Sequence, residues 1–171
     1  MKIKGIETKR LKLRNYEKTD MQFVMSIWND PEMGKYLPDP VIDQIDEKYR
    51  HALETLDEDE RCCYLISESK ETGERIGTCS FIPNEDGSVY DFAYCVHMKF
   101  GGQGYATEML KGMMYYAKTQ GAKHAIVFVN KENVASNLVV QKFKNSIIGE
   151  SKYKKVGTNL TFEDYKYCLE I

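Results

Sequence analysis

Three glycines fall within four residues, at Gly101, Gly102 and Gly104, directly before a segment with strong helical periodicity. A glycine-rich turn that enters a helix presents successive backbone N–H groups beside the positive end of the helix dipole, and this arrangement binds phosphate oxygens. Glycines are also used in ordinary strand–helix turns, where they supply positive φ angles. The helix is predicted by apolar residues that recur on one face, namely Ala106, Met109, Leu110, Met113, Met114 and Ala117.

Two nucleotide-binding fingerprints fit this glycine cluster poorly. The dinucleotide fingerprint GxGxxG is only partial, because Thr107 stands where the third glycine belongs. Asn130 stands where an acidic residue should end the next strand. The Walker A phosphate loop needs a GK[ST] sequence, which the cluster lacks. A nucleotide-binding protein is therefore a disfavoured interpretation of the loop.

The five cysteines and three histidines form no metal-binding pattern. The number of cysteines is odd, no CxxC spacing occurs, and the adjacent Cys62 and Cys63 point to opposite faces of a strand. The histidines form no HExxH-like pair. We therefore expect no metal site, and we expect the cysteines to be buried and reduced, as in a reducing compartment.

The chain has the length and composition of one domain without a membrane segment. It has 171 residues, of which 42% are hydrophobic and 29% are charged. Its formal net charge is −2, so no general positive field attracts a nucleic acid. No apolar run has the length of a signal peptide or a membrane span. We expect a single domain over residues 1–171, located in the cytoplasm, that binds neither nucleic acid nor membrane.

The order of hydrophobic patterns predicts the elements that must position the glycine cluster. Strands are expected over residues 11–15, 62–68, 75–82, 88–97, 124–130, 147–153 and 160–169. Helices are expected from Thr19 or Asp20 to Trp28 and over residues 43–56, 104–119 and 134–143. This order predicts an α/β (α+β) fold, with a mixed, mostly antiparallel sheet flanked by helices and one β-α-β crossover through the helix that follows the glycines.

Four short motifs, in register along the chain, carry a resemblance to a known family. Residues 102–108 (GQGYATE) resemble the pyrophosphate loop of the GNAT superfamily of N-acetyltransferases, and residues 133–136 (NVAS) resemble its second motif, NxxS. Residues 8–14 (TKRLKLR) look like the TxRLxLR start of the RimJ/RimL-like branch, and residues 91–94 (DFAY) resemble the EIGY strand of that branch. Together the matches cover about residues 8–145.

Three positions depart from the family pattern. Gly101 stands where relatives often have Arg or Gln, and Lys144-Asn145 replaces the usual Gly-Phe after the second-motif helix. Val140 stands where many relatives have a tyrosine that acts as general acid, and a valine cannot donate a proton. A second hypothesis takes these departures as an eroded site: a non-catalytic acyl-CoA-binding or regulatory module on the same fold.

The resemblance implies transfer of the acetyl group of acetyl-CoA to a primary amine, by direct attack in a ternary complex. It implies that backbone amides of the glycine loop hold the CoA pyrophosphate and that a backbone N–H near the end of the preceding strand stabilises the thioester oxyanion. The residues implied to bind acetyl-CoA are Cys95, Val96, His97, Gly101, Gly102, Gln103, Gly104, Tyr105, Ala106, Thr107, Asn133 and Ser136.

The resemblance also suggests the acid–base groups. Asp91 occupies the position of the branch's strand carboxylate and is the candidate general base; a solvated or N–H-capping carboxylate is the alternative. Ser136 is the hydroxyl at a motif position that could assist the leaving thiolate, and Tyr105 or another nearby tyrosine could replace it. Asn133 can cap the second-motif helix through the amide of Ser136 and also contact pantetheine.

The acceptor is open at this point: a protein N-terminus, a polyamine or another small amine. By resemblance, the acceptor pocket should form from residues 28–40 and from the closing strands. Several lysines make the later segment basic, either to meet the 3′-phosphate of CoA or as a solvated face. The chain is either a monomer or a homodimer.

Overall fold

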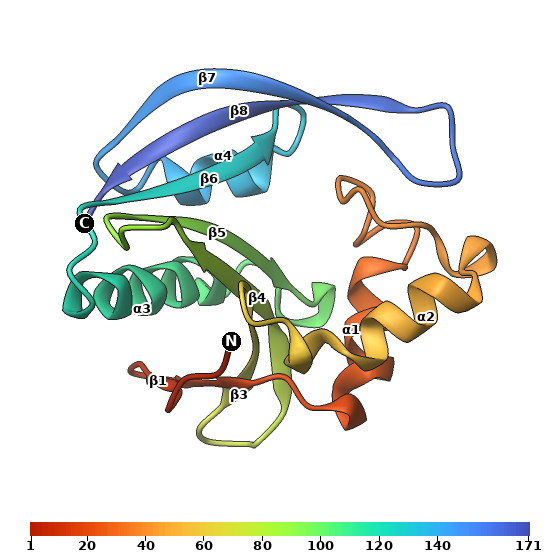
Figure 1. Ribbon diagram of the computed structural model, residues 1–171, viewed down its shortest axis with the longest axis horizontal. Coiled ribbons are helices and arrows are strands. Elements are labelled where there is room, and N and C mark those ends of the chain that lie inside the picture. Colours follow the sequence, from red (N-terminus) through yellow and green to blue (C-terminus); the bar gives the residue numbers. More distant parts are fainter.

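The computed structural model describes residues 1–171 and has one eight-stranded sheet at its centre, in the order β1-β2-β3-β4-β5-β6-β8-β7, with four helices around it (Figure 1). The strands are β1 Ile6–Glu7, β2 Leu11–Asn15, β3 Cys63–Ser69, β4 Arg75–Pro83, β5 Val89–Val96, β6 His124–Asn130, β7 Asn145–Lys154 and β8 Thr161–Glu170. The helices are α1 Met21–Trp28, α2 Glu47–Glu54, α3 Tyr105–Thr119 and α4 Val134–Val140. The predicted mixed fold is confirmed.

One pair of neighbouring strands in this sheet is parallel. β5 and β6 run in the same direction, and every other neighbouring pair is antiparallel. Parallel neighbours need a crossover connection, and α3 supplies it after the glycine loop. The single predicted β-α-β unit is therefore at the predicted place, with the loop at the carboxyl end of β5.

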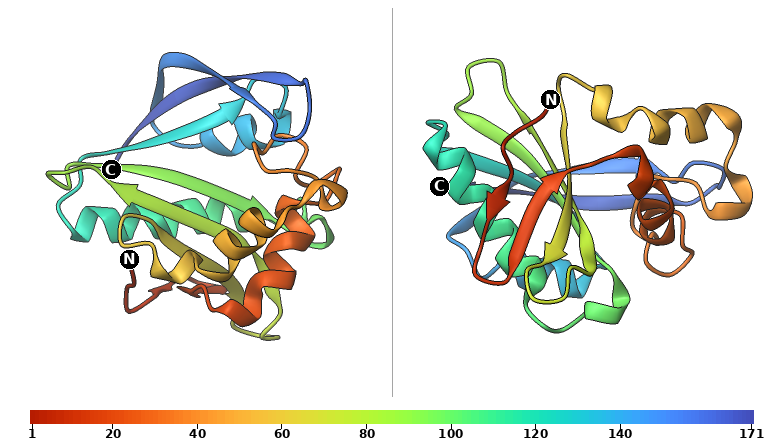
Figure 2. Two further views of the ribbon diagram at one scale, coloured as in Figure 1. Left: turned by 45° about the vertical axis from the view of Figure 1, so that its right-hand side comes forward. Right: turned by 90° about the horizontal axis from the view of Figure 1, so that it is seen from below.

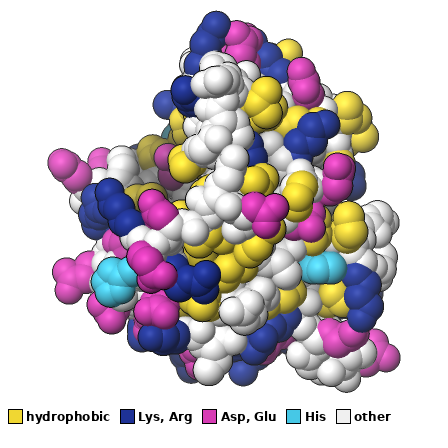
Figure 3. Space-filling view, turned by 90° about the vertical axis from the view of Figure 1, so that its right-hand side faces the viewer, with side chains coloured by type: hydrophobic (Ala, Val, Ile, Leu, Met, Phe, Trp, Pro, Cys, Tyr) yellow, Lys and Arg dark blue, Asp and Glu magenta, His cyan; other side chains and the backbone are white.

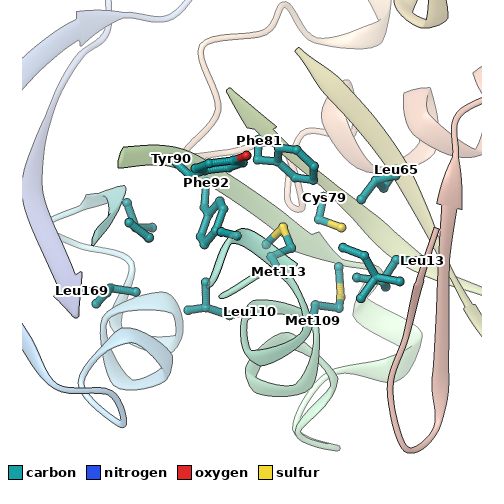
Figure 4. Packing of buried hydrophobic residues seen from close by; sticks show 14 of the residues in the cluster. Leu13, Leu65, Cys79, Phe81, Tyr90, Phe92, Met109, Leu110, Met113 and Leu169 are labelled. Carbon is teal, nitrogen blue, oxygen red and sulfur yellow. The ribbon is translucent and has the colours of Figure 1, made fainter. Parts of the chain in front are cut away.

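Helix α3 packs its apolar face against the sheet and forms the main core. Met109, Leu110 and Met113 are fully buried, and they pack with side chains from several strands, including Leu13 and Phe92 (Figure 4). This is the face that the helical spacing predicts. The helix also ends as predicted, because Gly121, with a φ of +93°, follows it.

A second, smaller core lies on the opposite face of the sheet, under α1 and α2. Its buried residues include Val24 and Met25 of α1, Leu53 of α2 and Ile66 of β3. Viewed from below, α3 and the α1–α2 pair lie on opposite sides of the strands (Figure 2, right). The sheet is thus covered on both faces.

The structure differs from the prediction at several element ends and in one added strand, and three of these differences have a local cause. β1 was not predicted, because two residues are too few for a periodicity; it forms by pairing with β2. α2 starts only at Glu47, because the side chain of Asp46 accepts the Tyr49 N–H at 2.7 Å and caps the helix there. α4 ends at Val140 rather than at residue 143. After it, the side chain of Asn145 donates to the Phe143 carbonyl at 2.8 Å.

Asp20 precedes α1 but does not cap it, because its carboxylate lies in a buried ion-pair network. The Asp20 side chain is fully buried and accepts from Arg14 at 2.6 and 2.8 Å. Arg75 lies 3.0 Å from the same carboxylate. Burial raises the pKa of Asp20. Hydrogen bonds from Arg14 and from the Glu17 N–H lower the pKa by more than burial raises it, so the pKa lies below its ordinary value. The network joins β2 and β4 to the start of α1.

We predict that Asp20→Asn lowers the free energy of unfolding by about 3 kcal/mol at pH 7, because it leaves two arginines without their buried partner. Since the folded pKa is depressed, the stabilisation is present above the unfolded pKa of about 4 and is lost as the pH falls below it. Urea unfolding at pH 7 and pH 3 measures both effects. Asp43→Asn, at an exposed carboxylate, is the control, and equal stability of both variants at pH 7 contradicts the prediction.

Candidate active site

A cavity opens where β5 and β6 stop pairing. Parallel pairing joins Val89–Phe92 to His124–Val127 and ends there. The residues that follow, Ala93–Val96 and Phe128–Asn130, diverge and line a cavity of about 560 Å³. Because a strand that loses its neighbour leaves backbone groups unpaired, the divergence directs polar backbone groups of β5 into the cavity.

The glycine loop closes one end of this cavity with a row of free amides. None of the backbone N–H groups from Gly102 to Thr107 donates to a protein acceptor. Gly102 and Gly104 have φ angles of +72° and +79°, which glycine adopts without strain, whereas Gly101 has an ordinary φ of −59°. The amides lie at the N-terminus of α3, where the helix dipole favours a negative charge. This end of the cavity can bind a diphosphate.

The first motif of the chain holds this loop in place. The carboxylate of Glu108 accepts from the Arg10 N–H at 2.6 Å, from Arg10 Nε at 2.7 Å and from Thr8 Oγ1 at 2.7 Å. Arg10 Nη1 also donates to the Gln103 carbonyl at 3.0 Å, and its guanidinium lies 4.2 Å from the centre of the Tyr105 ring. The TxR sequence therefore anchors the loop to β2.

Gln103 does not line the cavity, unlike the other predicted loop residues. Its carbonyl is turned toward Arg10, on the outer side of the loop. The predicted acetyl-CoA residues that do line the cavity are Cys95, Val96, Gly101, Gly102, Gly104, Tyr105, Ala106, Thr107, Asn133 and Ser136.

The backbone of β5 offers an amide at Val96 rather than at His97. The His97 N–H donates to the Ile76 carbonyl at 2.9 Å, and the His97 ring stacks on Phe23, so His97 does not line the cavity. In an antiparallel ladder, alternate residues bond to the same neighbour. Since His97 bonds to the β4 side, the N–H groups of Val96 and Tyr94 face the gap toward β6. Of the backbone N–H groups near the end of this strand, those of Val96 and Tyr94 are therefore the candidate donors into the cavity.

The second motif brings two hydroxyl groups together. The side chain of Asn133 accepts the Ser136 N–H at 3.1 Å and caps α4, as predicted. Ser136 Oγ lies 2.8 Å from the hydroxyl of Tyr94, and both residues line the cavity. Burial raises the pKa of Tyr94 to about 12, so this phenol stays protonated at neutral pH. Val140, at the tyrosine position of many relatives, is fully buried in the core.

Asp91, the predicted general base, lies outside the cavity. It is exposed and belongs to the stretch of β5 that is still paired with β6, before the strands diverge. Its side chain therefore does not reach the lining, and the motif position alone did not reveal this.

The carboxylate that does line the cavity is Asp164 of β8, which the sequence analysis did not identify. It lies opposite Asn130, the last residue of β6. Its Oδ1 atom is buried and has no hydrogen-bond partner. Burial raises its pKa to about 6. Asp164 is thus ionised at neutral pH and free to accept a proton.

The loop after α1 and the β7–β8 hairpin close the far end of the cavity, which we call the acceptor end. Met33, Tyr36 and Leu37 contribute side chains to the lining. The buried ammonium of Lys155 holds the loop by donating to the carbonyls of Gly34, Leu37 and Asp39 at 2.9, 2.9 and 2.8 Å. Of the regions expected to form the acceptor pocket, residues 28–40 contribute these three side chains to the lining, and the closing strands contribute Asp164.

The cavity carries opposite charges at its two ends. Lys142 Nζ lies 3.4 Å from Thr107 Oγ1, beside the free amides of the glycine loop. Asp164 lies beside Asn130, whose side chain donates to Tyr153 at 3.4 Å, and Tyr153 donates to the Tyr36 carbonyl at 2.6 Å. The loop end therefore attracts an anion and the acceptor end a cation.

Two further findings concern metals and membranes. No group of three or more His, Cys, Asp or Glu side chains is arranged to hold a metal ion. No helix is both long enough and apolar enough to span a membrane.

Known proteins share sequence with this chain. The sequence model of the protein family described as the acetyltransferase (GNAT) domain matches residues 10–144. The chain is 31% identical over 119 residues to the uncharacterized N-acetyltransferase p20 of Bacillus licheniformis, and the match spans 66% of this chain and 65% of that protein.

Solved structures share the fold. An acetyltransferase (GNAT family) from Bacillus anthracis has a TM-score of 0.81 at 21% identity, covering 97% of this chain and 98% of the other. The spermidine N-acetyltransferase of Vibrio cholerae, in complex with CoA and spermine, has a TM-score of 0.76 at 16% identity and 94% and 96% coverage. A RimL ribosomal L7/L12 α-N-protein acetyltransferase is also similar, with a TM-score of 0.80 at 17% identity and 98% and 94% coverage. Because the acetyltransferase (GNAT) domain matches residues 10–144, the chain belongs to the GNAT family of acetyltransferases, as its motifs predicted.

Proposed function

We propose that this chain transfers the acetyl group of acetyl-CoA to a primary amine within the cavity between β5 and β6. The observation that carries the proposal is the row of free amides from Gly102 to Thr107 at one end of a cavity whose other end holds the unpaired carboxylate of Asp164. The amides suit a diphosphate and the carboxylate suits an ammonium, and the divergent strands lie between these two ends.

The loop amides and Lys142 bind the diphosphate of acetyl-CoA. Between the loop and Asp164, the exposed backbone of β5 runs along the cavity, so the pantetheine arm can pair with it as an added strand. The Val96 N–H then faces the thioester carbonyl and donates to its oxygen as negative charge develops there. This residue set supplies N–H donors and one cation, which fit the diphosphate of acetyl-CoA.

Asp164 accepts a proton from the attacking amine. The amine nitrogen bonds to the thioester carbon, the carbon–sulfur bond breaks, and the sulfur leaves with its electron pair. An ionised carboxylate with a pKa near 6 can hold the ammonium form of the acceptor and take its proton, directly or through one water. Asp91, favoured on the motif, lies outside the lining, so the geometry favours Asp164 as base.

The hydroxyl pair of Tyr94 and Ser136 stabilises the departing sulfur. A phenol with a pKa of about 12 is a weaker acid than a thiol, whose pKa is about 8.5, so Tyr94 donates a hydrogen bond to the thiolate and keeps its proton. Ser136 orients the phenol at 2.8 Å. Tyr94 thus supplies a hydrogen-bond donor to the sulfur, which Val140 cannot do.

The second candidate function is an acyl-CoA-binding module without catalysis, favoured by Val140 and Gly101. The two functions differ in one measurement, the release of free CoA thiol from acetyl-CoA in the presence of a panel of primary amines. We expect amine-dependent release. Tight binding of acetyl-CoA without release for any amine supports the second function.

We predict that Gly102→Ala weakens acetyl-CoA binding about tenfold, because a side chain at a φ of +72° strains the loop and moves its amides. Isothermal titration with acetyl-CoA measures the dissociation constant. Gly87→Ala is the matched control: it has a φ of +71°, and, as at Gly102, a Cβ there has no neighbour within 4 Å. Equal affinities of the two variants contradict the proposed loop contact.

We predict that Asp164→Asn lowers kcat/KM by about a hundredfold or more, since general bases contribute roughly 10²–10⁴-fold, and leaves acetyl-CoA affinity unchanged. In the wild type, kcat/KM falls as the pH drops through about 6, because the protonated carboxyl cannot accept a proton. Asp91→Asn is the control and keeps activity. A large loss in Asp91→Asn with none in Asp164→Asn reverses the assignment of the base.

We predict that Tyr94→Phe lowers kcat about tenfold or more with little change in KM for acetyl-CoA, because it removes the donor to the leaving sulfur. Ser136→Ala has a smaller effect, since the phenol remains. Steady-state kinetics with acetyl-CoA and one saturating amine measures both. Tyr115→Phe, on the exposed side of α3, is the control. A larger loss in Ser136→Ala than in Tyr94→Phe makes the serine the donor instead.

A further inference from the structure

The acceptor end of the cavity holds one carboxylate and walls that are mostly apolar. Among all residues that line the cavity, Asp164 is the only acidic and Lys142 the only basic one, and Lys142 lies at the loop end. The side chains that line the acceptor end are otherwise apolar or aromatic, apart from Asn130: Met33, Tyr36, Leu37 and Phe128.

Other charged groups near this end are paired or lie outside the lining of the cavity. The ammonium of Lys155 is enclosed by three carbonyl oxygens. The carboxylate of Asp39 accepts from the Tyr49 hydroxyl at 2.7 Å and does not line the cavity. Glu163, next to Asp164, forms ion pairs with Lys131 and Lys152 outside the cavity. No second carboxylate therefore lines the cavity.

This charge inventory discriminates between classes of amine. One ammonium group can pair with Asp164, but a second ammonium in the same molecule would be desolvated without a partner. An acceptor with its own carboxylate would place that group near Asp164, and the nearest lysines, Lys35 and Lys166, pack over the Tyr36 and Phe128 rings without lining the cavity. The peptide groups of a protein N-terminus would also meet walls that offer few hydrogen-bond partners.

The aromatic wall is fixed in place before any acceptor binds. The Tyr36 ring lies edge-on to Phe162, with centroids 6.1 Å apart, and the Tyr36 carbonyl accepts from Tyr153 at 2.6 Å. Figure 3 views the molecule from the side that carries α1, α2 and the tip of the β7–β8 hairpin, and hydrophobic side chains gather near the middle of this face. A preformed apolar wall favours an apolar body over a flexible polar one, because burial is gained with little ordering cost.

From these observations we infer that the acceptor is a small monoamine: one primary amine on an apolar, preferably aromatic body, with no second charge. The ammonium pairs with Asp164, and the body packs between Tyr36, Leu37 and Phe128. This inference rests on the proposed acetyl transfer and specifies its acceptor.

The test compares four acceptors with the wild-type enzyme, by the rate of CoA thiol release: 2-phenylethylamine, n-butylamine, spermidine and a short peptide with an N-terminal serine. We expect kcat/KM for 2-phenylethylamine to exceed that for spermidine and for the peptide about tenfold or more. Butylamine has the same charge as 2-phenylethylamine and a smaller apolar body. We therefore expect its kcat/KM to lie between that of 2-phenylethylamine and those of spermidine and the peptide.

A charge-altered variant tests the charge inventory directly. Leu37→Asp adds a second carboxylate to the wall, and Leu37→Asn is its neutral control of the same shape. We expect Leu37→Asp, but not Leu37→Asn, to raise the ratio of spermidine to phenylethylamine turnover about tenfold. Acetyl-CoA affinity by isothermal titration serves as the check that both variants are folded, and Tyr36→Ala, expected to lower phenylethylamine preference, gives a second readout.

The outcomes separate the inference from the proposed function. Highest kcat/KM for spermidine or for the peptide overturns the monoamine inference and leaves acetyl transfer intact. Acetyl-CoA binding with no thiol release for any of the four amines overturns the proposed function, and the inference with it.

Discussion

The site depends on the early end of the parallel ladder between β5 and β6. Four residue pairs hold the two strands together, and after Phe92 and Val127 they separate. A buried backbone group without a partner costs about 1–3 kcal/mol, so a strand edge opened inside a protein is stable only where a cavity gives it solvent or a ligand. The same divergence creates the volume of the cavity and aims the Val96 amide into it. Helices α3 and α4 line it, and the rest of the sheet keeps the two strands at their angle.

The divergence also fixes the direction in which the substrates lie. Positive potential is concentrated at the glycine loop, where the dipole of α3, the free amides and Lys142 coincide. Negative potential is concentrated at Asp164, on the strand that pairs with β6. A molecule with an anionic head and a reactive tail can therefore enter in one orientation only. The proposed chemistry follows from this orientation, because Asp164, Val96 and the hydroxyl pair all line the cavity beyond the glycine loop.

Local patterns were sufficient to predict the fold and the loop. The helical spacing in α3, the alternation in β2 and the turn residues each encode a short-range preference, and those elements form where predicted. The proposed base was not predictable in this way, because Asp164 follows another acidic residue in an alternating strand and lines the cavity only through its position opposite Asn130. Likewise, Tyr94 contacts Ser136, which lies 42 residues further along the chain. The motif placed Asp91 correctly on its strand, but only the register shows that this part of the strand is still paired.

Lys155 has a consequence for how this site can diverge among related enzymes. One ammonium at the tip of the β7–β8 hairpin donates to three carbonyls of the loop after α1, so these hydrogen bonds hold the two segments together. An insertion or deletion in either segment would displace the carbonyls from the charge that they solvate, and a buried ammonium without acceptors is costly. Length changes are thereby disfavoured. New specificities in this lineage are expected to arise by exchange of side chains at positions 33, 36 and 37 on an unchanged backbone.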